Sequence, residues 1–104
     1  MAESKSQSRQ LLIIGSGPTG LGAAWRLEEL LHHDKSQKLA WDWTLLESSN
    51  SVGGLASSVT DEQGFTWDRG GHVVFSHYDY FTALLDAVLS KEQWIHHKRE
   101  AWVG

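Results

Sequence analysis

The sequence contains no cysteine, a single proline and no apolar run long enough to span a lipid bilayer. Without cysteine there is no disulfide framework and no thiolate metal site, and we expect no metal and a cytoplasmic location. Basic residues are also few: nine lysines and arginines stand against thirteen acidic residues, for a net charge of −4. No basic stripe is available to neutralise a phosphate backbone, which argues against a nucleic-acid partner. A membrane partner is not expected either.

The chain has 104 residues, the length of one small domain. Residues 1–9 are polar and lack the apolar stretch of a signal peptide, so we expect a disordered leader followed by a partial domain over residues 10–104. The final residues, Trp102 to Gly104, carry no helix stop or polar tail, which indicates an interruption. Six tryptophans are many for this length, and we expect them in the core or at a domain interface.

The periodicity of apolar residues predicts an α/β fold. Gln10–Ile14 is almost wholly apolar, which is typical of a central parallel strand covered on both faces. Residues 19–33 repeat apolar side chains at helical spacing, and residues 41–47 are rich in β-favouring types. Strand, helix and strand in this order form a βαβ unit, which requires parallel pairing. Further along we expect a solvated turn at 32–38, a loop at 48–54, extended segments at 65–68 and 72–75, and a helix at 78–89.

A glycine-rich turn joins the first strand to the helix. Gly15, Gly17 and Gly20 match the pattern Gly-x-Gly-x-x-Gly, in which the first glycine permits the tight turn. The second lets a pyrophosphate approach the backbone, and the third lets the helix pack on the sheet. Pro18 suits the first helical turn, where its missing N–H costs nothing. The free amides of this helix start attract an anion, so we expect a dinucleotide here.

Glu47 closes the second strand, where a carboxylate can accept hydrogen bonds from a ribose diol. It lies 27 positions after Gly20, against about 20 in the usual fingerprint. The polar turn at 32–38 accounts for the excess. The alternative interpretation is a solvated acid at the end of a strand.

Two later motifs separate flavin from nicotinamide. Glu47-Ser48-Ser49, followed by Val52-Gly53-Gly54-Leu55-Ala56-Ser57, resembles the signature of flavoproteins related to amine oxidases. A second glycine pair lets more backbone pass close to the phosphates and ribityl chain. The block Gly70-Gly71-His72-Val73-Val74-Phe75-Ser76-His77-Tyr78 is similar to the eukaryotic type of UDP-galactopyranose mutase, and the resemblance runs from about Leu11 to Trp102.

The resemblance implies non-covalent binding of FAD and interconversion of UDP-galactopyranose and UDP-galactofuranose. In that family the reduced flavin acts as a nucleophile on the sugar, with no net redox change. The resemblance makes His72 the catalytic candidate, beside the isoalloxazine ring, and Phe75 a part of the uridine pocket. A structural role for His72 and core packing of Phe75 are the alternatives. The cofactor-binding candidates are Gly15, Gly17, Pro18, Thr19, Gly20, Glu47, Ser48, Gly53, Gly54, Leu55, Ala56, Ser57, Gly71 and His72.

The expected architecture is therefore an incomplete Rossmann-like βαβ unit of the FAD-binding kind, with a parallel sheet. Family enzymes are several times longer and carry the UDP-sugar site in later segments, so we expect the chain alone to be inactive. Two other functions stay open: part of an amine-oxidase-like, FAD-dependent oxidoreductase, or a non-catalytic nucleotide-binding remnant. The block from Gly70 to Tyr78 favours the mutase.

Overall fold

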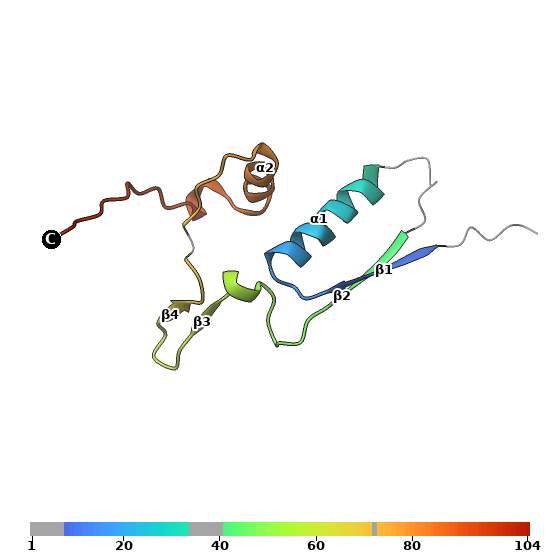
Figure 1. Cartoon of the computed structure of the whole chain (residues 1–104), viewed down its shortest axis with the longest axis horizontal. Helices are drawn as coiled ribbons and strands as arrows, with labels where there is room; N and C mark the ends of the chain where they lie inside the picture. Colours follow the sequence, from blue (N-terminus) through green and yellow to red (C-terminus); the bar gives the residue numbers. More distant parts are fainter. Residues whose placement is uncertain (1–7, 34–40, 72) are drawn as a thin grey trace, which may run out of the picture. The chain divides into compact units, whose positions relative to one another are not determined.

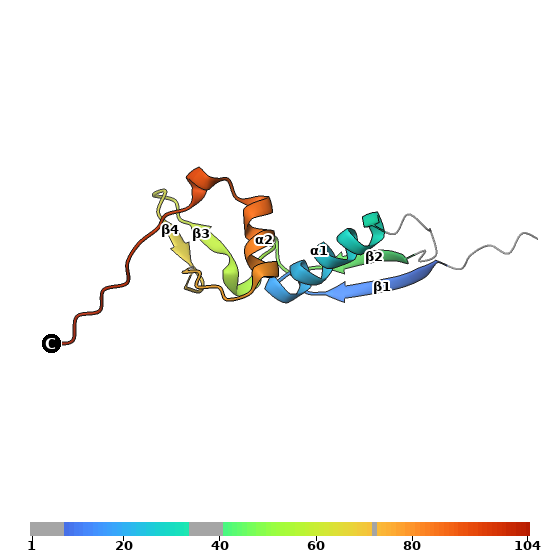
Figure 2. The ribbon, with the colours of Figure 1, turned by 90° about the horizontal axis from the view of Figure 1, so that it is seen from above.

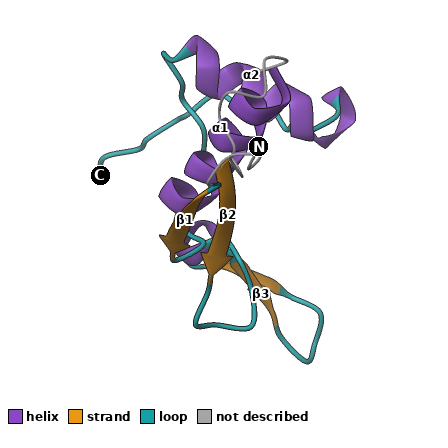
Figure 3. Ribbon diagram, turned by 90° about the vertical axis from the view of Figure 1, so that its right-hand side faces the viewer, coloured by secondary structure: helices purple, strands orange, loops and turns teal. Residues whose placement is uncertain are grey.

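Two parallel strands with a helix between them in sequence form the first part of the chain. In this computed structural model β1 (Arg9–Ile14) pairs with β2 (Trp41–Leu46), and α1 (Pro18–His33) connects them. The arrows of β1 and β2 point the same way in Figure 3, and Figure 2 shows α1 running alongside both. The structure describes residues 8–33, 41–71 and 73–104. The predicted βαβ unit and its parallel pairing are confirmed.

The register of the two strands sorts their side chains by face. Leu11 lies opposite Trp43 and Ile13 opposite Leu45, and these four side chains are half-buried where α1 packs. Ala24 of α1 is 8% exposed, and among the described residues it is the buried apolar side chain. The core of the unit therefore lies between α1 and one face of the sheet.

The opposite face of the sheet is open, which corrects the prediction that β1 is covered on both sides. Ile14 is 82% exposed, and Leu12 and Leu46 are also exposed. The physical reason is that the pair has one helix, and one helix covers one face. The tryptophans do not form a buried core within this chain, contrary to that part of the prediction. Four of the six are half-buried, and Trp67 and Trp102 are exposed. A domain interface stays a prediction.

An antiparallel hairpin follows the βαβ unit, and the sequence analysis found only its second half. β3 (Ser58–Thr60) pairs with β4 (Thr66–Asp68), preceded by the short 3-10 helix η1 (Gly54–Ala56) (Figure 1). Asp61 closes the turn, because its carboxylate accepts hydrogen bonds from the amides of Gln63 and Phe65 at 3.0 and 2.9 Å. Its other oxygen accepts one from the Trp67 indole at 2.9 Å.

The described residues divide into two compact units, the first ending at Gly71 and the second covering residues 73–104. In the second unit α2 (Asp79–Val88) lies within one residue of the predicted helix at each end, with Tyr78 as its N-cap. The 3-10 helix η2 (Lys91–Gln93) begins with a capping box between Ser90 and Gln93. Residues 73–75 form no strand, so the extended segment predicted there is not found as regular structure. Where the turn was predicted, at 32–38, His32 and His33 end α1, and 34–38 lie outside the described residues.

Gly20 offers a direct test of how tightly α1 meets β1. A Cβ on Gly20 would overlap the carbonyl oxygen of Gly15 and lie 3.4 Å from Ile13 Cγ2. Because that oxygen belongs to the backbone, Gly20→Ala should lower the free energy of unfolding by about 3 kcal/mol. Gly22, two residues further along α1, meets nothing within 4 Å. Gly22→Ala should raise the stability by about 0.5–1 kcal/mol. Urea denaturation followed by circular dichroism measures both, and equal effects would contradict the packing described.

Candidate dinucleotide site

The glycine turn lies where the sequence places it, between β1 and α1. Gly15 has a φ of +93°, a conformation that side chains disfavour, and its amide donates to the Leu46 carbonyl at 2.7 Å. Pro18 is the first residue of α1, as predicted. Gly17 has nothing within 4 Å of the place a Cβ would take. The turn therefore presents open space beside a helix start whose first amides have no partner within the helix.

Glu47 lies directly after β2 and is tied to this turn. Its Oε2 accepts hydrogen bonds from the amide and the hydroxyl of Ser16, at 2.8 and 2.6 Å. Its Oε1 accepts from the amide and the hydroxyl of Ser49, both at 2.9 Å. The carboxylate thus joins the glycine turn to the loop after β2. Sequence reasoning found Glu47 but missed both serines.

These bonds set the charge of Glu47. Hydrogen bonds from Ser16 and Ser49 lower the pKa of Glu47 from 4.5 to about 2, and the hydroxyl of Ser16 has the largest effect. Desolvation opposes them and is the smaller influence. The group is therefore a carboxylate throughout the physiological range, which is the form that accepts hydrogen bonds from ribose hydroxyls.

The second glycine pair lies against the first turn. The Gly53 amide donates to the Ser16 carbonyl at 2.8 Å. A Cβ on Gly54 would lie 3.1 Å from Gly17 Cα, so the two backbones are in close contact. The chain after this pair is held by the hairpin, where the Arg69 amide donates to the Ser57 carbonyl at 3.1 Å. The structure thus brings together the turn, Glu47 and residues 53–57, although β2 separates them from α1 in sequence.

The remaining predicted site residues differ in how far they are exposed and in which unit they belong to. Pro18, Thr19, Ser48, Leu55, Ala56 and Gly71 are exposed, while Ser57 is half-buried. Gly70, next to Gly71, lies so close to the Leu55 carbonyl that a Cβ would be 2.7 Å from that oxygen. His72 lies outside the described residues. Phe75 belongs to the second unit, where it is 85% exposed and meets the His77 ring edge-on at 4.7 Å.

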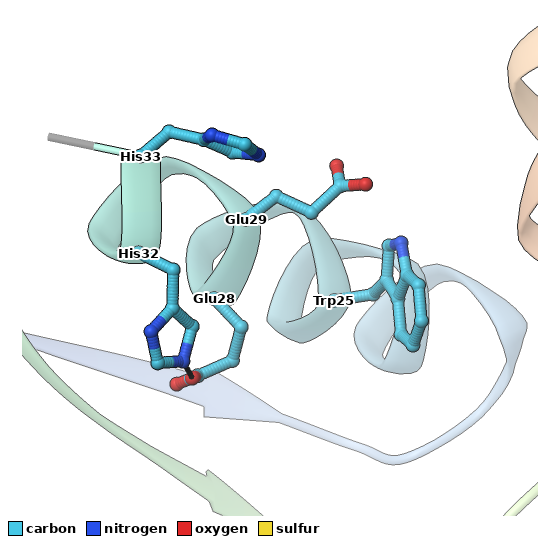
Figure 4. Close-up of a pocket in the computed structure, with 5 residues that line it drawn as sticks. All are labelled: Trp25, Glu28, Glu29, His32 and His33. Carbon is cyan, nitrogen blue, oxygen red and sulfur yellow. Dashed lines mark ion pairs between the residues drawn. The ribbon is translucent and has the colours of Figure 1, made fainter. Parts of the chain in front are cut away.

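A hollow elsewhere on α1 is a different feature. It has a volume of about 320 Å³ and is lined by Trp25, Glu28, Glu29, His32 and His33, all from one helix (Figure 4). His32 pairs with Glu28 at 3.2 Å, and the Trp43 indole donates to Glu28 at 2.6 Å. The hollow lies at the carboxyl end of α1, away from the glycine turn at its start. Glu28 therefore links α1 to β2 at the end of the helix that lies away from the glycine turn.

Comparison with known proteins agrees with this geometry. Residues 13–88 match the family described as the NAD(P)-binding Rossmann-like domain. The chain belongs to this family. It is also similar to a crystal structure of reduced UDP-galactopyranose mutase, with 48% identity over 81% of the chain and a TM-score of 0.67. The matched region spans 16% of the length of that mutase.

These findings confirm the Rossmann-like fold and the predicted resemblance to the mutase. Family membership and the mutase likeness together indicate a flavin or nucleotide cofactor. NAD and FAD share an adenosine diphosphate half, which Rossmann-like domains bind. Over the described part of the chain, no helix is long and apolar enough to cross a membrane. The same residues hold no group of three or more His, Cys, Asp or Glu side chains arranged to bind a metal ion.

The lowered pKa of Glu47 gives a pH-dependent stability. Because the folded pKa is about 2 and the ordinary value is 4.5, ionised Glu47 stabilises the fold above pH 4.5. That contribution is lost as the pH falls from about 4.5 towards 2. We expect Glu47→Gln to be less stable than the unsubstituted chain at neutral pH and to lose less stability over this window. Urea denaturation across the window measures the difference.

Glu62→Gln is the matched control, since it removes an equal charge from an exposed residue of the hairpin turn. It should reproduce the steep acid loss of the unsubstituted chain. If Glu47→Gln gave that same steep loss, the hydrogen bonds to Ser16 and Ser49 would not be stabilising the fold.

Proposed function

We propose that this chain is the FAD-binding part of a UDP-galactopyranose mutase. The observation that carries the proposal is the junction of the glycine turn, Glu47 and the second glycine pair, combined with 48% identity to the reduced mutase. When bound, the reduced flavin would supply the nucleophile for interconverting UDP-galactopyranose and UDP-galactofuranose. The chain's own residues bind and orient that cofactor.

The fit to FAD rests on three features of the site. Open space at Gly17 and the amides at the start of α1 suit a pyrophosphate. Glu47 is ionised and suits a ribose diol. Gly54 passes Gly17 closely, which supplies a second stretch of backbone beside the phosphates and favours flavin over nicotinamide. The UDP-sugar would be bound by the full-length enzyme, with Phe75 a candidate for its uridine pocket.

In this proposal residues 10–104 form a partial FAD-binding domain and residues 1–9 precede it. The cofactor contacts are Gly15, Gly17, Pro18, Thr19, Gly20, Glu47, Ser48, Gly53, Gly54, Leu55, Ala56, Ser57, Gly71 and His72. A carboxylate with saturated hydrogen bonds does not exchange protons near neutral pH, so Glu47 binds and takes no part in acid–base chemistry.

A graft tests the assignment. Residues 8–104 would replace the matching segment of the solved mutase, giving a protein that we call the grafted mutase. We expect it to purify with FAD and, once reduced, to interconvert the two UDP-sugars. Flavin content without interconversion, accompanied by oxidation of an amine, would favour an oxidoreductase. A folded graft that binds no flavin would contradict the proposal.

Gly17→Val in the grafted mutase tests the pyrophosphate position. Its side chain enters open space, so folding should be preserved. The same side chain would stand where the pyrophosphate approaches, so FAD content should fall by at least tenfold, on the order of 1.4 kcal/mol. Gly22→Ala, in the same helix but away from the turn, is the control and should keep its flavin. Normal FAD content in Gly17→Val would show that the pyrophosphate does not bind at this turn.

His72→Ala tests the catalytic candidate. A histidine beside the flavin has a pKa near neutrality that suits hydrogen-bond tuning of the ring. The variant should retain FAD and lose about 10²–10⁴-fold in kcat. His33→Ala is the control, because His33 is exposed and lies at the carboxyl end of α1, away from the glycine turn. An unchanged kcat for His72→Ala would assign the residue a structural role.

A further inference from the structure

Ser16 is the most enclosed residue of the candidate site. It is 0% exposed, and among the described residues it is the buried polar one. Its amide and hydroxyl both donate to Glu47, and its carbonyl accepts from Gly53. The turn after β1, the end of β2 and the loop at Gly53 therefore meet at this one residue.

The Glu47 carboxylate has no unused acceptor position while the Ser49 hydroxyl donates its one hydrogen to Oε1. A carboxylate offers about four lone-pair sites, and Glu47 accepts two hydrogen bonds at each oxygen. A ribose diol can therefore bind Glu47 only by displacing donors that are already present. Backbone amides cannot turn away without moving the chain, so the donors that can leave are hydroxyls.

The two hydroxyls differ in their freedom to leave. The Ser16 hydroxyl is buried and donates a hydrogen bond to Glu47 at 2.6 Å. The Ser49 hydroxyl is exposed and lies 2.9 Å from Glu47 but 2.7 Å from the Ser51 carbonyl. It has one hydrogen to donate, so it can serve either acceptor. When the Ser49 hydroxyl rotates towards the Ser51 carbonyl, it exchanges one hydrogen bond for another and leaves an acceptor position free on Glu47 Oε1.

We propose that Ser16 is a positioning residue that fixes Glu47 against the phosphate-binding turn before the cofactor binds, while the Ser49 hydroxyl yields its place on Oε1 to a ribose hydroxyl. This inference rests on the proposed function, since it deepens the account of the same site. Its consequence is an asymmetric carboxylate: Oε2 anchors the side chain and Oε1 recognises the ligand. The ordering of Glu47 is thus already complete in the free protein, which favours binding.

The first test compares serine variants of the grafted mutase by their dissociation constants for FAD. Ser16→Ala should weaken binding by about 10- to 100-fold, the range for a lost hydrogen bond to a charged group. Ser49→Ala should change it by less than about threefold, because its hydroxyl leaves on binding. Ser51→Ala is the control, since the side chain is exposed and only its carbonyl takes part. Ser49→Ala as harmful as Ser16→Ala would overturn the asymmetry.

A double-mutant cycle separates positioning through Glu47 from a general packing role. On a Glu47→Gln background, Ser16→Ala should cost less than about threefold in FAD affinity, because the partner it positions is already altered. An equal loss on both backgrounds would assign Ser16 to packing alone. Ser16→Cys keeps the volume with a weaker donor, so it should fall between serine and alanine. It also covers the case in which Ser16→Ala fails to fold.

A readout without flavin distinguishes failure of this inference from failure of the proposed function. In the ¹³C-labelled chain, the Glu47 carboxyl should titrate at about 2, and Ser16→Ala should raise that midpoint more than Ser49→Ala does. A midpoint at the ordinary 4.5 in the unsubstituted chain would overturn the inference. A low midpoint that Ser16→Ala raises, found together with a grafted mutase that binds no flavin, would retain the positioning role and reject the FAD assignment.

Discussion

The carboxylate of Glu47 holds together the carboxyl ends of β1 and β2. β2 ends at Leu46, and the loop that follows is tied to the turn after β1 by Glu47 and by the Gly53 amide. Glu47 does so by accepting hydrogen bonds from Ser16 on one side and Ser49 on the other. Each bond to an ionised acceptor is stronger than a neutral one, so a few contacts fix a loop that has little apolar burial. The geometry of the dinucleotide site follows from this tie.

Close contacts between glycine backbones also position the segments of the candidate site. Gly20 lies so close to the Gly15 carbonyl that a Cβ is excluded, and a Cβ on Gly54 would be only 3.1 Å from Gly17 Cα. These contacts leave the cradle lined by main chain, which suits a pyrophosphate that is recognised by amides. The core beneath is small, because α1 covers one face of a two-stranded sheet and Ile14 on the other face is 82% exposed. The site is therefore built mainly by hydrogen bonds and close backbone contacts, and less by apolar packing.

Sequence reasoning predicted the elements whose signals are local. The glycine spacing, Pro18 and the apolar runs placed β1, α1 and β2 within one or two residues. It missed β3, although Asp61 and Gly64 mark a turn before Phe65, because three residues of Ser-Val-Thr carry too little alternation to predict a strand. It also missed Ser16 and Ser49 as partners of Glu47. Such bonds depend on which parts of two loops meet in space, and spacing along the chain does not report that.

Local sequence signals also do not tell whether the second face of the sheet is covered or whether the tryptophans are buried, since both depend on what packs against the unit.

The most direct test of the central claim is a nuclear magnetic resonance titration of this chain with adenosine diphosphate, the half of the cofactor that the glycine turn and Glu47 would hold. We expect amide shifts concentrated at Gly17, Thr19, Gly20 and Ser49. Shifts confined to Trp25 and His32 on the far part of α1, or no shifts at saturating ligand, would contradict the account.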